Sequence, residues 1–150
     1  MEEIVWLKKR ADCILQDCFN DKRALKLESK SSFEFIFNEQ NRSDRSSKLL
    51  ASYINYRLTN AQEADAGGIL IDSGLILSLF RAQNSVDIFE DQYVKQLGAR
   101  LLQNDCNDLL EKNLADVLRD ECSENMTTKV DLMFNELNIS RDIVKQFKDQ

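Results

Sequence analysis

The sequence predicts an all-α protein, because it lacks turn-forming residues and carries apolar residues at helical spacing. Its 150 residues include no proline and four glycines, whereas an all-β fold needs many turns, which these two residue types usually form. Hydrophobic residues make up 43% of the chain, enough for one core or for two small helical units that share an interface. We therefore expect about seven or eight helices and no sheet.

The amino-terminal part of the chain predicts two helices. In the first, over residues 2–20, apolar side chains recur at spacings of three and four, which gathers them on one stripe. That stripe is formed by Ile4, Leu7, Ala11, Ile14, Leu15, Cys18 and Phe19. The second helix covers residues 22–38, and its polar middle, ESKSS, permits a break there. Its inward-facing side chains are expected to be Leu25, Leu27, Phe33, Ile36 and Phe37.

The third and fourth helices follow a polar segment, NEQNRSDRS, that is rich in turn formers. The third is expected over residues 46–59. Its buried side chains should be Leu49, Leu50, Tyr53, Ile54 and Leu58. The fourth begins near Asn60, whose side chain can accept from free backbone N–H groups, while Glu63 completes a capping box. This helix is expected to end near Gln83.

The fifth and sixth helices are predicted from apolar periodicity and cap residues. Ser85 should cap the fifth, which contains residues 87–102, and Asp87 lies in its first turn, where the helix dipole favours a carboxylate. Its apolar face consists of Ile88, Phe89, Tyr93, Leu97 and Leu101. Gly98 allows a neighbouring helix to approach closely. The sixth helix, over residues 107–122, should bury Leu110, Leu114, Val117, Leu118 and Cys122.

Two more helices are expected at the carboxy-terminal end of the chain. A capping box at Thr128 and Asp131 should begin the seventh helix, and Ser140 should cap the eighth. Their buried side chains are expected to be Val130, Met133, Phe134 and Leu137 in the seventh and Ile143, Val144 and Phe147 in the eighth.

The charge balance changes near residues 83–86, where we place a boundary between two packing units, residues 1–84 and 85–150. The first unit carries 12 basic and 12 acidic side chains and the second 8 and 14, so the net charge of −6 lies in the second. Nucleic-acid binding needs clustered Lys and Arg, and the short basic stretch at residues 41–48 contains Asp44 and predicts a solvated loop. We expect no nucleic-acid partner.

No segment predicts a membrane span or a secretory signal. The most apolar run, residues 67–80, is too short to cross a bilayer and contains Asp72, so we interpret it as a buried helix. The amino terminus, MEEIVWLKKR, is charged from its second residue, unlike a signal peptide. The four cysteines are Cys13, Cys18, Cys106 and Cys122. They form no C-x-x-C pair, which favours reduced, mostly buried thiols in the cytoplasm or nucleus.

The sequence contains no combination of residues that predicts a reaction centre. It has no histidine, which excludes Ser-His-Asp and Cys-His catalysis and mixed zinc sites. Its adjacent carboxylates, which point about 100° apart on a helix, are Glu2/Glu3, Glu90/Asp91 and Asp120/Glu121. Asp105, Asp108 and Glu111 lack the glycine turn of a calcium loop and predict a helix start with a polar surface. We therefore predict no catalytic, cofactor-binding or metal-binding residue and no small-molecule substrate.

Other side chains with functional potential have structural interpretations. Gly67 and Gly68 lack the remaining residues of a phosphate loop and indicate a packing or kink site. Half-buried positions, with the hydroxyl at the rim of the core, are expected for Tyr53, Tyr56 and Tyr93. Trp6 could anchor a partner, although covering an edge of the core is the better interpretation.

The order of residues in the fifth helix resembles the cullin family. Residues 87–102, DIFEDQYVKQLGARLL, are similar to the cullin pattern K-D-V-F-E-x-x-Y-x-x-x-L-A-x-R-L-L. The matching residues are Asp87, Phe89, Glu90, Tyr93, Leu97, Arg100, Leu101 and Leu102. Ile88 is a conservative change, whereas Val86 and Gly98 depart from the pattern.

Three other segments resemble cullins in the same order along the chain. Residues 32–38 are similar to F-E-x-F-I-N, residues 48–58 to E-L-L-A-x-Y-x-D-x-x-L, and residues 118–140 to L-K-x-E-C-G-x-x-F-T-S-K-L-E-x-M-F-x-D-M-x-x-S. The matches in the last segment are Leu118, Glu121, Cys122, Thr127, Lys129, Met133, Phe134 and Ser140. Ser123 replaces a glycine and Met126 an aromatic residue, so the turn there should be built differently. The segments between the matches are divergent.

The resemblance implies a non-catalytic scaffold of a multisubunit RING-type ubiquitin ligase. Residues 1–84 would be the end of the last stalk repeat and residues 85–150 the start of a four-helix bundle. The implied partners of the parent protein are a RING subunit, a substrate adaptor and cullin regulators, in the cytoplasm and nucleus. The lysine that receives the ubiquitin-like modifier falls outside this segment. A free-standing helical interaction module without ligase assembly is the alternative, and a small enzyme is a third class.

Overall fold

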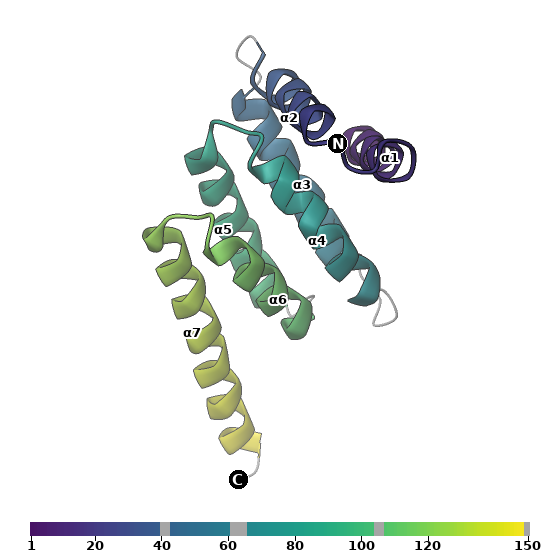
Figure 1. Cartoon of the computed structure of the whole chain (residues 1–150). Helices are drawn as coiled ribbons and strands as arrows, with labels where there is room; N and C mark the ends of the chain where they lie inside the picture. The colour runs from purple at the N-terminus through teal and green to yellow at the C-terminus, as the bar shows by residue number, and fades with distance from the viewer. Residues whose placement is uncertain (40–42, 61–65, 104–106, 149–150) are drawn as a thin grey trace.

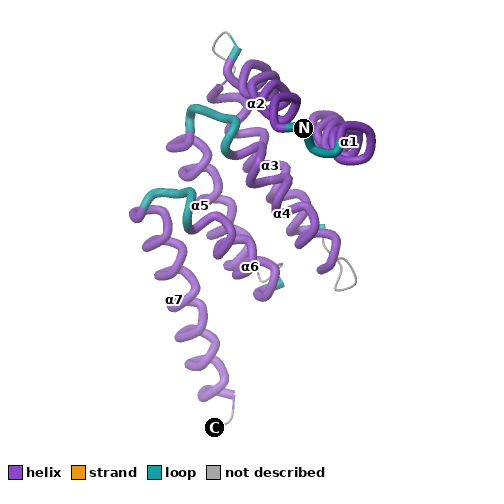
Figure 2. The backbone as a smooth tube through the Cα atoms, viewed as in Figure 1, coloured by secondary structure: helices purple, strands orange, loops and turns teal. Residues whose placement is uncertain are grey.

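The computed structural model describes residues 1–39, 43–60, 66–103 and 107–148, which form seven helices and no strand (Figure 2). The helices are α1 (Glu2–Phe19), α2 (Arg23–Asn38), α3 (Ser43–Thr59), α4 (Ala66–Phe80), α5 (Val86–Gln103), α6 (Asp108–Arg119) and α7 (Glu124–Lys148). The prediction of an all-α fold is confirmed.

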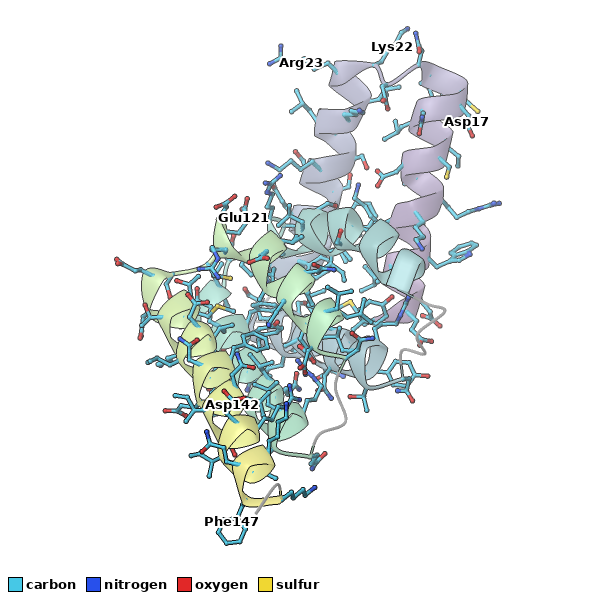
Figure 3. All side chains as sticks on the ribbon, turned by 90° about the horizontal axis from the view of Figure 1, so that it is seen from below. Asp17, Lys22, Arg23, Glu121, Asp142 and Phe147 are labelled. Atoms are coloured by element: carbon cyan, nitrogen blue, oxygen red, sulfur yellow. The ribbon has the colours of Figure 1, made fainter. Side chains whose placement is uncertain are left out.

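Five helices lie side by side, and a helical hairpin projects from them. In Figure 1, α3 to α7 run roughly along one direction or its reverse, whereas α1 and α2 are seen almost along their axes. The perpendicular view shows this hairpin lengthwise, with Asp17, Lys22 and Arg23 near its far end (Figure 3). The most extensive packing joins α3 to α5, followed by α4 to α6 and α5 to α7. We call α3–α7 the body and α1–α2 the hairpin.

The core of the body is built on the predicted apolar face of α5. Phe89, Tyr93 and Leu97 are fully buried, the Phe89 ring lies 4.9 Å from that of Phe80, and it stacks on Tyr93 at 5.9 Å between centroids. The other residues predicted to be buried and found so are Phe33, Phe37, Leu50, Ile54, Leu58, Leu101, Leu110, Leu114, Leu118, Val130 and Phe134. This core includes side chains from both sides of residue 84, and the division into two packing units stays a prediction.

The apolar stripe predicted for the first helix is largely uncovered in the hairpin. Leu7, Ile14 and Phe19 are 47%, 51% and 46% exposed, and the buried residue of α1 is Val5. The main helical neighbours of α1 are α2 and α4, so much of its surface has no helix packed against it. Three residues of the next two helices that were predicted to be buried are exposed: Leu27, Ile36 and Leu49.

The predicted seventh and eighth helices form one continuous helix, α7. The capping-box prediction is wrong, because Thr128 lies inside this helix and its hydroxyl donates to the carbonyl of Glu124 at 2.8 Å. Asp131 instead accepts hydrogen bonds from Arg119. Ser140 also lies in mid-helix, so the predicted cap of an eighth helix is wrong. The residues expected to be buried near the end of α7 are exposed: Ile143, Val144 and Phe147.

The fourth helix begins later than predicted, and the second is unbroken. α4 begins at Ala66, whereas Asn60 directly follows α3, and its side chain donates to the carbonyl of Tyr56 at 2.8 Å. Glu63, the other half of the predicted capping box, lies outside the described residues. α2 continues through the polar ESKSS segment. In the parts of the chain that the structure covers, no helix has the length and apolar character that a membrane span requires.

The sixth helix begins as predicted and ends earlier. The side-chain oxygen of Asn107 caps it by accepting from the backbone N–H groups of Leu109 and Leu110, at 3.1 and 3.3 Å. The helix ends at Arg119, so Cys122 lies in the turn that leads to α7.

Candidate functional site

The acidic side chains considered for a cation site do not come together. Asp108 pairs with Arg141, Glu111 is buried against a different cation, and Asp105 lies outside the described residues. The prediction of polar surface is therefore wrong for Glu111. Within the described ranges, no group of three or more Cys, Asp or Glu side chains could hold a metal ion.

The aromatic residues occupy positions that differ from the half-buried ones predicted. Tyr93 is fully buried and Tyr56 is 55% exposed, whereas Tyr53 is buried with its hydroxyl accepting from Nη1 of Arg57 at 3.1 Å. Trp6 is 62% exposed, which contradicts the interpretation that it covers an edge of the core. The sequence predicted that these rings pack, and it did not predict which ones lie at the surface.

The cysteines are free thiols but are less buried than predicted. Cys13 and Cys18 are exposed, Cys122 is half-buried, and Cys106 lies outside the described residues. Burial, reinforced by two nearby carboxylates, raises the pKa of the Cys122 thiol to about 12. This thiol is therefore protonated at neutral pH, and its chemistry is that of a packing residue.

A buried ion pair joins three helices of the body. Arg100 of α5 and Glu111 of α6 are 3% and 1% exposed. Nε of Arg100 donates to Oε1 of Glu111 at 2.5 Å, and Nη2 donates to Oε2 at 2.9 Å. Nη1 donates to Oδ1 of Asn55 in α3 at 2.5 Å, and the guanidinium carbon lies 6.0 Å from the centre of the Tyr93 ring. We name Arg100, Glu111 and Asn55 the Arg100 cluster.

The two charged members of the Arg100 cluster lie on the apolar faces of their own helices. Arg100 follows the buried Leu97 by three residues, and Glu111 precedes the buried Leu118 by seven, so each points into the body. An isolated buried charge costs several kcal/mol, so the fold tolerates these two residues as a pair. Sequence reasoning missed both, although a charge in phase with an apolar stripe was a signal that could have identified them.

Side chains from α2 and α3 bind the turn between α4 and α5. Nδ2 of Asn38 donates to the carbonyl of Ala82 at 2.8 Å, and its Oδ1 accepts from the backbone N–H of Asn84 at 3.0 Å. Ser85 precedes α5, as predicted for a cap residue, and its hydroxyl donates to Oδ1 of Asp44 at 2.9 Å. The turn that contains the predicted boundary is therefore tied to the preceding helices.

The turn between α6 and α7 is bound in the same manner, and its Glu121 is labelled in Figure 3. Arg81 donates to Glu121 at 2.5 Å, and this hydrogen bond lowers the pKa of the carboxyl group. Glu90 of α5 accepts from the backbone N–H of Ser123 at 2.5 Å and from its hydroxyl at 2.6 Å. The same hydroxyl accepts from the N–H of Met126, which caps α7. The serine that replaces the expected glycine thus builds this turn with its side chain.

A groove of about 600 Å³ lies between the hairpin and the end of α4. Charged side chains on its rim are paired within the chain, Lys8 with Asp12 at 2.5 Å and Lys26 with Asp21 at 2.8 Å. These pairs use the charge that an ionic ligand would need, so we assign no function to the groove.

The fold and the polar contacts together define a class of protein. A chain of packed helices whose polar side chains join one helix to the next is typical of α-solenoid proteins. The family that the sequence matches is Cullin, described as the cullin alpha solenoid domain, and the match covers residues 1–144. The chain therefore belongs to the cullin family.

The relatives that the chain matches include cullins from distant eukaryotes. It is 29% identical to Cullin-4 of Dictyostelium discoideum over 154 residues, 28% identical to Cullin-4A of Homo sapiens over 150, and 30% identical to Cullin-4 of Schizosaccharomyces pombe over 155. Each alignment includes 99% of this chain but 19%, 20% and 21% of the respective relative. The chain thus spans about a fifth of the length of these curated relatives.

Proposed function

We propose that the chain is a non-catalytic scaffold segment of a multisubunit cullin-RING ubiquitin ligase. The observation that carries the proposal is membership of the cullin family over residues 1–144. The polar contacts support it, because Asn38, Glu90 and the Arg100 cluster use buried or partly buried groups to hold helices against one another. A spacer needs such cross-links, since its work is to keep two distant sites at a defined separation.

Within the scaffold, we place residues 1–84 at the end of the last stalk repeat and residues 85–150 at the start of the four-helix bundle. The collinear resemblance of four segments supports this placement, as does the close packing of α3 on α5 across the boundary. The segment then links the end of the parent protein that binds a substrate adaptor to the end that binds a RING subunit. We also propose cullin regulators as partners of the parent, and the cytoplasm and nucleus as its location.

A free-standing helical interaction module, without ligase assembly, is the second candidate function. Exposed apolar side chains at both ends of the chain favour it, with Trp6 at 62% and Phe147 at 81% exposure. Figure 3 shows Phe147 at the far end of α7, pointing away from the body. Phe147 follows the exposed Ile143 and Val144 by four and three residues on the same helix, and contiguous exposed apolar groups commonly mark contact surfaces for other proteins.

The two candidates are separated by purifying the full-length protein from its source and identifying the proteins that accompany it. The scaffold proposal expects both a RING subunit and a substrate adaptor in the purified complex, and a tagged helical protein of unrelated family serves as the control. Reproducible absence of both, from a protein that is folded by circular dichroism, contradicts the scaffold and favours the module.

A further inference from the structure

We propose that the Arg100 cluster is the device that fixes the register of α6 relative to α3 and α5. Arg100, Glu111 and Asn55 would then act as positioning residues, holding two pairs of packed helices in one arrangement. The inference deepens the proposed scaffold function and rests on it for its biological meaning, because a spacer must keep one geometry.

α6 packs against α4 and α7, and neither α3 nor α5 is among its closely packed partners. α3 packs most extensively against α5, and α4 packs against α6, whereas α5 and α6 are not among the closely packed pairs. The long side chains of Arg100 and Glu111 cross between them. The cluster therefore links the α3–α5 pair to the α4–α6 pair.

Apolar contacts alone select the register of α6 weakly. Its buried face repeats leucine every four residues, at Leu110, Leu114 and Leu118. A shift by one helical turn, about 5.4 Å, would therefore bring one leucine to the place of the next. Because apolar attraction is non-directional, such a shift would bury nearly the same area.

The charged groups make the shifted register unfavourable. The two parallel N–H···O bonds between Arg100 and Glu111 form only when the guanidinium edge faces both carboxylate oxygens. A one-turn shift would separate the two groups and leave each charge buried without its partner. Asn55 adds a bond from α3, and its carbonyl oxygen accepts from the nitrogen of Arg100 that Glu111 does not use.

The test separates geometry from stability by measuring distances in the full chain. Spin labels are attached at the exposed positions Lys48 in α3 and Asp116 in α6, after the native cysteines are replaced. Electron–electron double resonance then gives the distribution of distances. In Arg100→Met/Glu111→Leu, apolar groups of similar size replace the ion pair. We expect a melting temperature within about 5 °C of the parent and a distance distribution roughly twofold wider, because the one-turn shift of about 5.4 Å becomes accessible.

A second variant keeps the test decisive if the double variant fails to fold. Asn55→Leu leaves the ion pair in place and removes the bond from α3. We expect it to widen the distances between Lys48 and Asp116 and, to a smaller extent, those between labels at Lys95 in α5 and Asp116, because α3 packs closely on α5. Leu97→Ala is the matched control, since it destabilises the same core and leaves all three residues of the Arg100 cluster unchanged.

The proposal is overturned if the folded variants of the cluster keep the narrow distribution of the parent. It is also overturned if Leu97→Ala widens the distribution as much as Asn55→Leu does, because the effect would then follow from lost stability. The distances are measured without any ligase partner. Their outcome therefore stands apart from the co-purification of a RING subunit and an adaptor, which tests the scaffold function itself.

Discussion

The hydroxyl of Tyr93 is buried without a hydrogen-bond partner, and its removal tests the packing of the body. The side chain is fully buried, and its Oη forms no hydrogen bond with any described group. The hydroxyl of Tyr53, by contrast, accepts from Arg57 at 3.1 Å. The two tyrosines form a matched pair, because Tyr→Phe deletes the same atom from a buried ring at both positions.

Deleting the Tyr93 hydroxyl should stabilise the protein. A buried hydroxyl without a partner costs about 1–3 kcal/mol relative to one that is bonded to water. The void left by one oxygen atom, about 20 Å³, costs roughly 0.5 kcal/mol. We therefore expect Tyr93→Phe to raise the free energy of unfolding by about 1 kcal/mol, which corresponds to about 2–4 °C in Tm. Tyr53→Phe should lower the free energy of unfolding by about 0.5–1 kcal/mol, because it removes a hydrogen bond.

The same hydroxyl predicts a dependence on pH. Burial raises the pKa of Tyr93, the Glu111 carboxylate raises it further, and the Arg100 guanidinium opposes them. In the unfolded chain a tyrosine ionises near pH 10. Since the folded pKa is the higher one, stability is unaffected by this group below about pH 10 and is lost as the pH rises above it. Tyr93→Phe removes that loss, so its advantage over the parent should grow between about pH 9 and pH 11.

Urea unfolding followed by circular dichroism, at neutral and at alkaline pH, measures both effects. The parent, Tyr93→Phe and Tyr53→Phe are compared under identical conditions. A Tyr93→Phe variant that is less stable than the parent by more than about 0.5 kcal/mol would refute the reasoning. It would show that the hydroxyl has a partner in solution, such as an internal water molecule.

Three further predictions concern the α6–α7 turn and the end of α7. Glu90→Gln should lower the free energy of unfolding in urea by about 1 kcal/mol, because its carboxylate accepts two hydrogen bonds from Ser123. Burial raises the pKa of the Cys122 thiol to about 12. This thiol should therefore react with Ellman's reagent at pH 8 on the order of a hundredfold more slowly than the thiol of the exposed Cys13. The exposed apolar side chains of α7 should cause association that depends on concentration, and Phe147→Ser should reduce it in sedimentation velocity.

Each of these predictions has its own control and contrary result. Asp91→Asn removes an exposed carboxylate that pairs with Lys95, and it should change the stability by less than about 0.5 kcal/mol. An equal loss in both acidic variants would contradict the role of Glu90 in binding the α6–α7 turn. As the control, Cys122 should react as fast as Cys13 when the protein is unfolded in urea. If the two thiols also react equally fast in the folded protein, the Cys122 thiol is accessible and the prediction is wrong. A chain that sediments as a monomer at every concentration and salt would contradict the association.

Helices with neighbours on several sides were predictable from the sequence. The fifth helix was expected to contain residues 87–102 after a cap at Ser85, and it lies at Val86–Gln103, with Phe89 and Leu97 buried as predicted. The predicted and observed helices agree because α5 lies between α3 and α7, where its apolar face packs against apolar side chains. The stripe of α1 has the same periodicity, yet Leu7 is 47% exposed. Periodicity identifies an apolar face, and the rest of the fold decides whether that face is covered.

Caps and buried charges were less predictable, because each depends on a partner that local sequence does not identify. Thr128 has the residue type of a helix cap, but inside a helix the same hydroxyl bonds to the carbonyl four residues earlier. Arg100 and Glu111 each place a charge on the apolar stripe of a helix. A charged residue considered without its partner predicts an exposed, polar surface. Their burial is favourable only because the two groups pair with each other, although they lie 11 residues apart along the chain.

The polar contacts explain how the boundary region can be a rigid connection. A rotation of α5 against α3 must break the bonds of Asn38 to the α4–α5 turn, the bond from Ser85 to Asp44, and the bond of Arg100 to Asn55. Each partly exposed bond contributes about 1 kcal/mol, so breaking all four costs about 4 kcal/mol. At that cost, a rotated arrangement is populated by on the order of one molecule in a thousand. Hydrogen bonds to this turn therefore hold the adjacent helices in one relative orientation, and a spacer between two binding ends requires such a fixed orientation.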